Sequence, residues 1–548
     1  MFSLDTQQWP FSGVTTTALL IVLLYAILYQ LQYVKRDPRE PTIVGSSIPF
    51  IGHPLQMVLE GGKYVKELGI VHRSKQIFTL PVPGSRIYIV TDPALASAVQ
   101  RASKALSFTP LIADATKRVM GLDAATVDIV RQNVDPEPGE PRGFLADLHD
   151  VIYTSLGPGP LLDEFSLDAA REMARQVNAF TDGLRARPGG DGETLDLLSW
   201  MQHLVTVGTA RFMYGPKNPI AAHPELEQAF WDFDHGLGLL LINVLPAVTA
   251  TKPYRGREAL VRAFAEYIEA GHHHRDAAVI SRMHIETSAK HGFSLDGQAR
   301  GEVSFLFAGI INTAITTFWL VLRIFADRDI LAAVRAEIEA AAASTVPEEE
   351  KEEEEEEDGK GIADDEIVLG LDAVRTRCRT LHAVFRECLR VGSDNYSTRL
   401  VKQDTLLADR HFLAAGSVVQ ISGGTMHADE GIWGAGAARG GAGFDHERFL
   451  RIDGREAQVH PAAFRAFGGG RTLCPGRHFA TSEILALAAA LVAVLDVEGD
   501  CEGGGLRVPE KNDRVLPIHI LEPRAEDKVG VRVRLRGGGP GKRVRIVA

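Results

Sequence analysis

An apolar run near the start of the chain is its clearest hydrophobic pattern. It extends from residue 14 to about residue 33, with only two glutamines near its end. At 1.5 Å per residue, about 20 helical residues cross the hydrocarbon core of a bilayer. Basic residues follow the run and an acidic residue precedes it, which favours a cytosolic position for the rest of the chain. We therefore expect an N-terminal segment at 1–13 and a transmembrane signal anchor at 14–34. A secretory peptide is disfavoured because no small-residue cleavage site follows, and a buried core helix fits this end of the chain poorly.

The pattern changes after the apolar run. Four prolines and several glycines between 35 and 55 predict a semi-rigid, proline-rich neck. Beyond the neck, "IYIVTDPALASAVQ" predicts a short strand, a turn at Asp92-Pro93 and a helix. Helical periodicity dominates from about 160 to 345, and strand-like runs return in "RLVKQDTLL", "SVVQIS" and "VLPIHILEP". The sequence therefore predicts a mainly α body with small β-sheets, an α+β fold, at 56–548.

Composition and charge exclude some classes of function. The chain has 548 residues, of which 45% are hydrophobic and 24% charged, as in ordinary globular proteins. The formal net charge of −12 argues against nucleic-acid binding. The tract "PEEEKEEEEEEDGK" contributes to that charge, and we expect it to form a solvated acidic insertion loop at 345–366. The four cysteines are scattered and form no CxxC pair, which disfavours both a disulfide framework and a structural zinc site.

One cysteine stands in a glycine-rich stretch, "FGGGRTLCPGRHFA" at 467–480. A thiolate that ligates haem iron must approach the porphyrin on exposed backbone, where glycines remove Cβ atoms and backbone N–H groups can tune the sulfur. The apolar helix predicted after Cys474 would favour a thiolate through its dipole, and Phe467 could shield the sulfur from water. A glycine loop around a buried structural cysteine is the alternative, and it leaves the glycines unexplained.

The same stretch resembles the haem-binding loop of the cytochrome P450 family. A phenylalanine, a glycine, the ligand cysteine and a second glycine stand at the family's spacing, here as Phe467, Gly470, Cys474 and Gly476. The resemblance implies the cytochrome P450 fold, with an N-terminal transmembrane helix. It also implies that Cys474 is the axial ligand of the iron of haem b (iron protoporphyrin IX).

Further motifs extend the resemblance. "FRECLR" contains Glu387 and Arg390, which are similar to the family's Glu-x-x-Arg pair, and "FDHERFL" supplies Arg448 as the third member of that structural triad. Most family members carry an arginine two residues before the cysteine, where it binds a haem propionate, but this chain has Thr472 there. The resemblance leaves Arg471, one place earlier, and Arg399, on a predicted strand, as the candidates for the propionate contact.

The predicted central helix departs from the common family pattern. "FLFAGIINTAITTFW" has Asn312 and Thr313 where the family usually has an acid followed by a threonine that deliver protons to dioxygen. This pattern and Thr472 together resemble the branch that contains sterol 7-alpha-hydroxylases and prostacyclin synthase. The alanine-rich and glycine-rich composition and the acidic insertion are similar to fungal members that act in secondary metabolism. We expect Asn312 to orient water and dioxygen, with Thr313 assisting.

The resemblance implies a monooxygenase that oxidises a bulky apolar terpenoid, sterol or polyketide-derived substrate. Dioxygen and electrons from NADPH-cytochrome P450 reductase would be needed, with cytochrome b5 as a second candidate donor. Residues expected at the substrate pocket are Phe305, Ala308, Gly309 and Leu516. We expect a monomer in the endoplasmic reticulum membrane, single-pass with a cytosolic catalytic domain. Two alternatives stay open: a haem-thiolate isomerase that needs no reductase, and a membrane haem protein without turnover.

Overall fold

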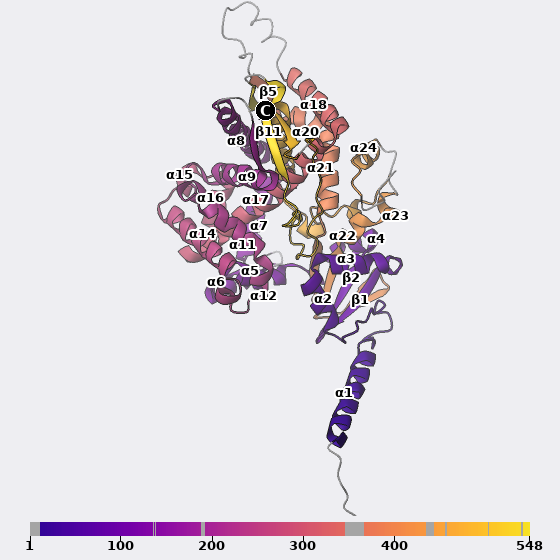
Figure 1. Cartoon of the computed structure of the whole chain (residues 1–548). Helices are drawn as coiled ribbons and strands as arrows, with labels where there is room; N and C mark the ends of the chain where they lie inside the picture. Colours follow the sequence, from indigo (N-terminus) through magenta and orange to yellow (C-terminus); the bar gives the residue numbers. More distant parts are fainter. Residues whose placement is uncertain are drawn as a thin grey trace, which may run out of the picture.

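The computed structural model describes residues 11–134, 136, 139–187, 192–345, 366–434, 443–454, 458–501, 503–538 and 541–548. The helix α1 (Phe11–Leu31) projects from one end of the body, and the C-terminus lies toward the opposite end (Figure 1). The acidic tract of the predicted insertion loop falls outside the described residues, as do residues 1–10 of the predicted N-terminal segment.

Helices form most of the body. After α1 they are α2 (Gly52–Glu60), α3 (Gly62–Val71), α4 (Pro93–Arg101), α5 (Thr109–Met120), α6 (Ala124–Arg131), α7 (Phe144–Leu156), α8 (Pro160–Arg185), α9 (Leu197–Tyr214), α10 (Pro219–Ala222), α11 (Leu226–His235), α12 (Leu237–Ile242), α13 (Pro246–Thr249), α14 (Thr251–Glu269), α15 (His273–Asp276), α16 (Val279–Lys290), α17 (Leu295–Ala326), α18 (Arg328–Ala343), α20 (Leu371–Arg377), α21 (Arg379–Gly392), α22 (Gly423–Ala428), α23 (Glu430–Trp433), α24 (Glu447–Asp453) and α25 (Arg477–Val494). The predicted dominance of helix between 160 and 345 is confirmed, with one short strand inside it.

The long central helix α17 organises the hydrophobic core. Ser294 caps its N-terminus, because the serine hydroxyl accepts a hydrogen bond from the Gly297 N–H at 3.1 Å. From Ala314 to Leu322 every side chain of α17 is buried, and all except the two threonines belong to the main hydrophobic cluster, together with most of α25. Burial on all sides explains why both helices are apolar all round rather than amphipathic.

Small sheets complete the α+β fold, as the sequence predicts. The largest has the order β1-β2-β9-β6-β3, in which β2 and β9 run parallel and the other pairs antiparallel. Smaller sheets have the orders β10-β11-β4, β12-β5 and β7-β8. The strand bounds are β1 Ile77–Val82, β2 Ser85–Val90, β3 Leu106–Ser107, β4 Glu193–Asp196, β5 Glu366–Gly370, β6 Tyr396–Val401, β7 Thr405–Leu407, β8 His411–Leu413, β9 Val418–Ser422, β10 Leu495–Gly499, β11 Gly530–Leu535 and β12 Arg543–Val547.

The local predictions around the sheets have mixed outcomes. The strand, turn and helix in "IYIVTDPALASAVQ" are confirmed as β2 and α4, and the Asp92 carboxylate caps α4 by accepting the Leu95 N–H at 2.8 Å. The strands in "RLVKQDTLL" and "SVVQIS" are also confirmed. The strand in "VLPIHILEP" is wrong, because residues 515–522 form a loop. In this loop the Ile520 and Leu521 N–H groups donate to Asn312 and Gly392 instead of to a neighbouring strand.

Three helices are relevant to membrane insertion. Leu295–Ala326 and Arg477–Val494 are long and apolar enough to cross a membrane, but 72% and 78% of their apolar windows are buried inside the protein. They are therefore core helices. In α1, the described stretch Thr16–Leu31 is a shorter apolar helix with an exposed surface. The fold alone does not assign a role to α1.

The end of α1 is fastened to the neck rather than joined by a loose linker. Ser46 donates its N–H to the Gln32 side-chain oxygen at 3.0 Å, and the Gln32 amide donates back to the Ser46 carbonyl at 3.3 Å. The Tyr25 hydroxyl donates to the Ser47 carbonyl at 2.8 Å. Gln32 is fully buried by these contacts. The two glutamine bonds set the angle at which α1 leaves the body.

Candidate active site

The cysteine loop joins a 3₁₀ turn at Gly470–Thr472 to the start of α25. The Cys474 N–H donates to the Phe467 carbonyl at 2.8 Å, which closes the loop, and the Tyr153 hydroxyl of α7 donates to the Leu473 carbonyl at 2.9 Å. Gly470 has a φ of 60°, and a Cβ atom there would lie 2.8 Å from the Gln100 Cβ of α4. The predicted requirement for glycine at 470 therefore comes from the turn and from α4.

Cys474 lies in a different electrostatic setting from the other buried cysteines. Burial raises the pKa of its thiol, but the Gly476 N–H and the Arg477 guanidinium act in the opposite direction. Burial raises the pKa of Cys378 and of Cys388 to about 12. A Cβ atom at Gly476 would be 3.9 Å from the Cys474 sulfur and would meet no protein atom closer than 3.7 Å. The protein itself therefore does not demand glycine at 476, and a ligand on the sulfur is the remaining reason for it.

The predicted triad is assembled and buried. The Glu387 carboxylate pairs with Arg390 through two bonds of 2.6 and 2.7 Å, and Arg448 Nε lies 3.6 Å from Glu387 Oε1. The exposed fractions of Glu387, Arg390 and Arg448 are 0%, 1% and 3%. Arg448 also donates to the Trp433 carbonyl at 2.7 Å. A carboxylate and two guanidinium ions thus share one desolvated site.

His427 connects this triad to the segment that precedes the cysteine loop, a role that no sequence motif predicts. Arg390 donates to the His427 carbonyl. The imidazole lies with Nδ1 at 2.8 Å from the Ser393 carbonyl and with Nε2 accepting the Arg465 N–H at 2.8 Å. Burial lowers the pKa of His427 to about 3, so the ring is neutral and its Nδ1–H donates to Ser393. The triad therefore holds the backbone at 465 through one neutral histidine.

A second pair of buried arginines lies beside the cysteine loop, and no acid in the described part of the chain pairs with it. Arg399 is 5% and Arg465 1% exposed. Arg399 donates to the Thr398 carbonyl at 2.7 Å and to the Thr472 hydroxyl at 2.5 Å, while Arg465 donates to the Ser397 hydroxyl at 2.8 Å. Among the residues that the structure describes, no carboxylate forms an ion pair with either arginine, and Arg465 Nε has no hydrogen-bond partner.

The charges of these two arginines are costly as they stand. Burial lowers the pKa of Arg399, and burial together with the charge of Arg399 lowers the pKa of Arg465 to about 10. Two desolvated cations side by side favour binding of an anion with two separate charges. The two propionates of haem have this character, so the residues fit the cofactor that the cysteine loop predicts. Arg465 was missed in the sequence, although a charge inside the apolar stretch "AAFRAF" is itself a signal that a buried partner is needed.

A cavity of about 820 Å³ opens beside Arg399. Arg399, Arg471, Thr472 and Pro475 line it, together with Lys104, which follows α4, and residues of α5 and α7 that include Tyr153. Arg471 is exposed, in contrast to Arg399 and Arg465. The structure therefore brings both predicted propionate candidates to one cavity, but it places Arg471 in the more solvated position.

Asn312 and Ala308 lie one turn apart on α17 and are both exposed, while Ile310 and Ile311 between them and Thr313 after them are buried. The Asn312 side-chain oxygen accepts the Ile520 N–H at 3.0 Å. A backbone N–H can only donate, so this bond fixes which end of the amide is oxygen. The amide Nδ2–H₂ group is then the part of Asn312 that is directed to a ligand.

Thr313 and Gly309 do not lie as predicted. The Thr313 hydroxyl donates to the Gly309 carbonyl at 3.0 Å and forms a hydrogen bond to the buried Glu483 of α25. A Cβ atom at Gly309 would lie 3.2 Å from the Met213 sulfur of α9. Gly309 and Thr313 are four residues apart and share one side of α17, which faces neighbouring helices. Both residues thus take part in helix packing, and the roles predicted for them stay predictions.

The other predicted site residues lie in different environments. Phe305 is half-buried, and its ring stacks on His284 with centroids 4.6 Å apart, so part of its surface is engaged inside the protein. Leu516 is 43% exposed in the loop after β10, near the start of α3, where the Gly62 N–H donates to the Val515 carbonyl at 2.9 Å. Phe467 is half-buried against the main hydrophobic cluster and contributes its carbonyl to the cysteine loop.

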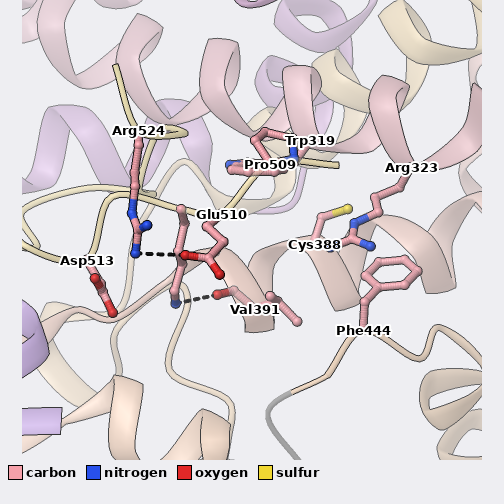
Figure 2. Close-up of a pocket in the computed structure, with 11 residues that line it drawn as sticks. Trp319, Arg323, Cys388, Val391, Phe444, Pro509, Glu510, Asp513 and Arg524 are labelled. Carbon is pink, nitrogen blue, oxygen red and sulfur yellow. Dashed lines mark hydrogen bonds and ion pairs between the residues drawn. The ribbon is translucent and has the colours of Figure 1, made fainter. Parts of the chain in front are cut away.

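A second cavity of about 340 Å³ lies between the C-terminal half of α17, the end of α21 and the loop at 509–524 (Figure 2). Arg524 forms an ion pair with Glu510 at 2.8 Å across it, and Lys511 donates to the Val391 carbonyl at 2.6 Å. None of the predicted pocket residues lines this cavity. Its charged wall makes it a poor site for a bulky apolar ligand.

Comparison with known proteins agrees with this geometry. A family model described as "Cytochrome P450" matches residues 373–519, which include the triad and the cysteine loop. The chain is 30% identical to the cytochrome P450 monooxygenase nodJ of Hypoxylon pulicicidum over 91% of this chain and 90% of that protein. It is 26% identical to a cytochrome P450 monooxygenase of Gibberella zeae, over 93% and 92% of the two chains. Weaker similarity, at 22% identity over 85% and 88%, links it to a 7-alpha-hydroxycholest-4-en-3-one 12-alpha-hydroxylase of Oryctolagus cuniculus.

Proposed function

The chain belongs to the cytochrome P450 family, and from that membership we propose that it is a haem b monooxygenase that oxidises a bulky apolar substrate. One observation carries the proposal: the cysteine loop stands beside two buried arginines that form no ion pair with an acid among the described residues. When bound, a thiolate-ligated haem supplies the activation of dioxygen.

The residues on the cysteine side hold the cofactor. Cys474 is the proposed axial ligand, and the Gly476 N–H and Arg477 stabilise its thiolate form. Arg399 and Arg465 are proposed to bind the two propionates. The Glu387–Arg390–Arg448 triad fixes the backbone of the loop through His427, so that ligand and arginines keep one relative geometry.

Asn312 is the proposed residue for proton handling on the other side of the cofactor. An amide is no acid, but its N–H can hold a water or hydrogen-bond dioxygen. The Ile520 N–H orients this amide, which reduces its rotational freedom before any ligand arrives. This role needs no contribution from Thr313.

A terpenoid, sterol or polyketide-derived substrate fits the apolar character of the predicted pocket. Ala308 and Leu516 remain as exposed apolar candidates for contact with it. The names of relatives include a sterol hydroxylase, which is consistent with a polycyclic ligand. Action in fungal secondary metabolism is part of the proposal.

We also propose that α1 anchors the protein in the endoplasmic reticulum membrane, with a monomeric catalytic domain at 56–548 in the cytosol. Apolar side chains are exposed on α1, on α2 and on the segment from α12 to α13. Figure 1 places α2 and α12 toward the end of the body from which α1 projects. Exposed apolar surface at that end supports contact with a membrane. NADPH-cytochrome P450 reductase, with cytochrome b5 as a second donor, would then reach the protein from the cytosolic side.

The carbon monoxide spectrum of the reduced protein tests the proposal. Thiolate ligation gives a diagnostic band, which Cys474→Ala should abolish together with activity. Cys378→Ala, Cys388→Ala and Cys501→Ala are matched controls that should keep the band. A normal band in Cys474→Ala would refute the proposed site. Product formation without any reductase would instead identify the isomerase alternative, and the absence of turnover under all conditions would favour a non-catalytic haem protein.

A further inference from the structure

Four metal-ligating side chains from two distant parts of the sequence meet away from the cysteine loop. Asp234 and His235 end α11, and His519 and Glu522 belong to the loop that contacts Asn312. Ligand atoms of Asp234, His235 and Glu522 all lie within 4.8 Å of one another. His235 Nε2 is 3.0 Å from Glu522 Oε2, and His519 Nε2 is 3.3 Å from Asp234 Oδ1.

The contacts of His519 favour a cation beside Asp234. His519 Nδ1 lies 2.7 Å from the Ile520 carbonyl, which can only accept, so Nδ1 carries a proton. In the neutral ring Nε2 then has a lone pair, and this lone pair faces the Asp234 carboxylate. Asp234 is 3% exposed, and neither of its carboxylate oxygens has a hydrogen bond of normal geometry. Either a proton on Nε2 or a metal ion would relieve this arrangement.

The surroundings resemble those of a metal centre. A metal-bound carboxylate usually accepts a hydrogen bond on its second oxygen. Here Gln202 of α9 donates to Glu522 Oε1 at 2.9 Å. Nitrogen and oxygen ligands 2.0–2.1 Å from a tetrahedral zinc ion are about 3.3 Å apart, close to the 3.0 Å between His235 Nε2 and Glu522 Oε2.

We propose that Asp234, His235 and Glu522 form a site for one divalent transition-metal ion, with Zn²⁺ as the best match to one imidazole and two carboxylates, and that His519 positions Asp234 beside it. Two carboxylates and one neutral imidazole carry two negative charges, which one such ion neutralises. The ion can enter from solvent because the side chain of His235 is 52% exposed, whereas Asp234 forms the buried base of the site.

Binding there would connect α11 to the central helix. The loop is already attached to α17, since the Ile520 N–H donates to Asn312 and the Trp319 indole donates to the Leu521 carbonyl at 2.8 Å. A metal ion bound by α11 and by this loop would therefore restrict the movement of α11 relative to α17. The proposal concerns residues outside the cysteine loop and does not depend on the proposed monooxygenase activity.

Zinc titration of the haem-loaded full chain in metal-free detergent buffer tests the site. After equilibrium dialysis against Zn²⁺, elemental analysis should give one zinc per haem iron, and zinc should raise the thermal unfolding temperature. Asp234→Asn and His519→Gln should each weaken zinc binding more than tenfold and remove the rise in unfolding temperature. X-ray absorption at the zinc edge should show one imidazole ligand, with zinc–ligand distances of about 2.0 Å.

His203→Gln is the matched control. His203 lies 3.0 Å from Glu227 in an equally exposed histidine–carboxylate pair that has no buried aspartate, so this variant should bind zinc like the wild type. If Asp234→Asn does not fold, Glu522→Gln serves as the second variant. Zinc binding that is unchanged in a folded Asp234→Asn or Glu522→Gln protein would overturn the proposal, as would a wild type that takes up no zinc. An intact carbon monoxide band in each variant separates this result from loss of the haem site.

Discussion

Two pairs of buried arginines lie close to the cysteine loop, and they differ in what they contact. Arg390 and Arg448 share the carboxylate of Glu387 and donate their other N–H groups to backbone carbonyls. Arg399 and Arg465 are as deeply buried, but they contact only hydroxyl groups and a carbonyl among the described residues. The first pair has a carboxylate within the protein, and among the described residues the second has none.

This difference separates residues that form the fold from residues kept for a cofactor. A buried ion pair that satisfies itself stabilises one arrangement of the chain, and breaking it leaves a charge without compensation. A buried cation without an acid destabilises the protein alone and gains when an anion binds. The same residue type therefore has opposite expected effects in the two pairs, which mutation can test.

The largest effect is expected for the triad. Glu387→Gln leaves Arg390 without a carboxylate among the described residues and Arg448 with only Asp445, 3.7 Å away, which should cost about 3–5 kcal/mol and prevent accumulation of folded, haem-loaded protein. Soluble yield and urea unfolding measure this. Glu339→Gln is the matched control, because Glu339 pairs with Arg536 at 2.7 Å but is 62% exposed, and its loss should cost less than about 1 kcal/mol. Equal stability of the two variants would remove the distinction drawn here.

Replacement of Arg399 or Arg465 should weaken haem binding without lowering the stability of the haem-free protein. Arg465→Leu and Arg399→Leu each remove a charged hydrogen-bond donor to a propionate, worth about 1.5–3 kcal/mol, so haem should dissociate about 10- to 150-fold faster. The haem-free protein should unfold at the same or a higher urea concentration than the wild type, because a buried unpaired charge is gone. Transfer of haem to excess apomyoglobin measures the first quantity.

Arg471→Leu provides the contrast for that experiment. Arg471 is exposed on the same cavity, so its replacement should change haem transfer less than either buried arginine does. A larger effect from Arg471 than from Arg465 would show that the arginine of the loop, and not the buried pair, binds the propionate.

Asn312, the residue proposed for proton handling, is neutral. Asn312→Leu removes both the acceptor for the Ile520 N–H and the proposed donor to dioxygen, a loss of about 1–3 kcal/mol, or about 5- to 150-fold in product formation. Carbon monoxide binding should persist while NADPH consumption exceeds product. Asn312→Thr should retain part of the activity because a hydroxyl can also donate. Full coupling in Asn312→Leu would reduce Asn312 to a packing residue.

The last effect depends on pH and concerns Glu483, a buried acid for which the described residues form no ion pair. Burial raises its pKa from 4.5 to about 8, with hydrogen bonds from Thr209 and Thr313 acting in the opposite direction. Between these values the folded protein keeps a proton that the unfolded chain has lost, so stability should fall by about 1.4 kcal/mol per pH unit as pH rises. Glu483→Gln should lack this dependence. If the free energy of unfolding changed equally with pH in both proteins between pH 5 and pH 8, this prediction would be contradicted.

The sequence predicted the parts of the site that lie close together along the chain. The cysteine loop, the Glu387–Arg390 turn and the central helix each carry a local pattern, and each lies where the pattern indicates. His427 and Arg465 were not predicted, because their roles arise from contacts between segments that no spacing links. Pocket residues on α17 were predicted only in part, since a buried helix is apolar on every side and its pattern does not tell which side faces a ligand.

The two bonds between Gln32 and Ser46 have a practical consequence for producing the protein. Removal of residues 1–34 takes away the whole apolar run, but it also takes away Gln32 and leaves the Ser46 N–H and carbonyl without their partner. A shorter deletion that keeps Gln32 also keeps part of the run and its tendency to aggregate. Solubility and native geometry of the neck are therefore competing aims in any truncated version, and a polar replacement of the exposed α1 residues that spares Gln32 is the way to obtain both.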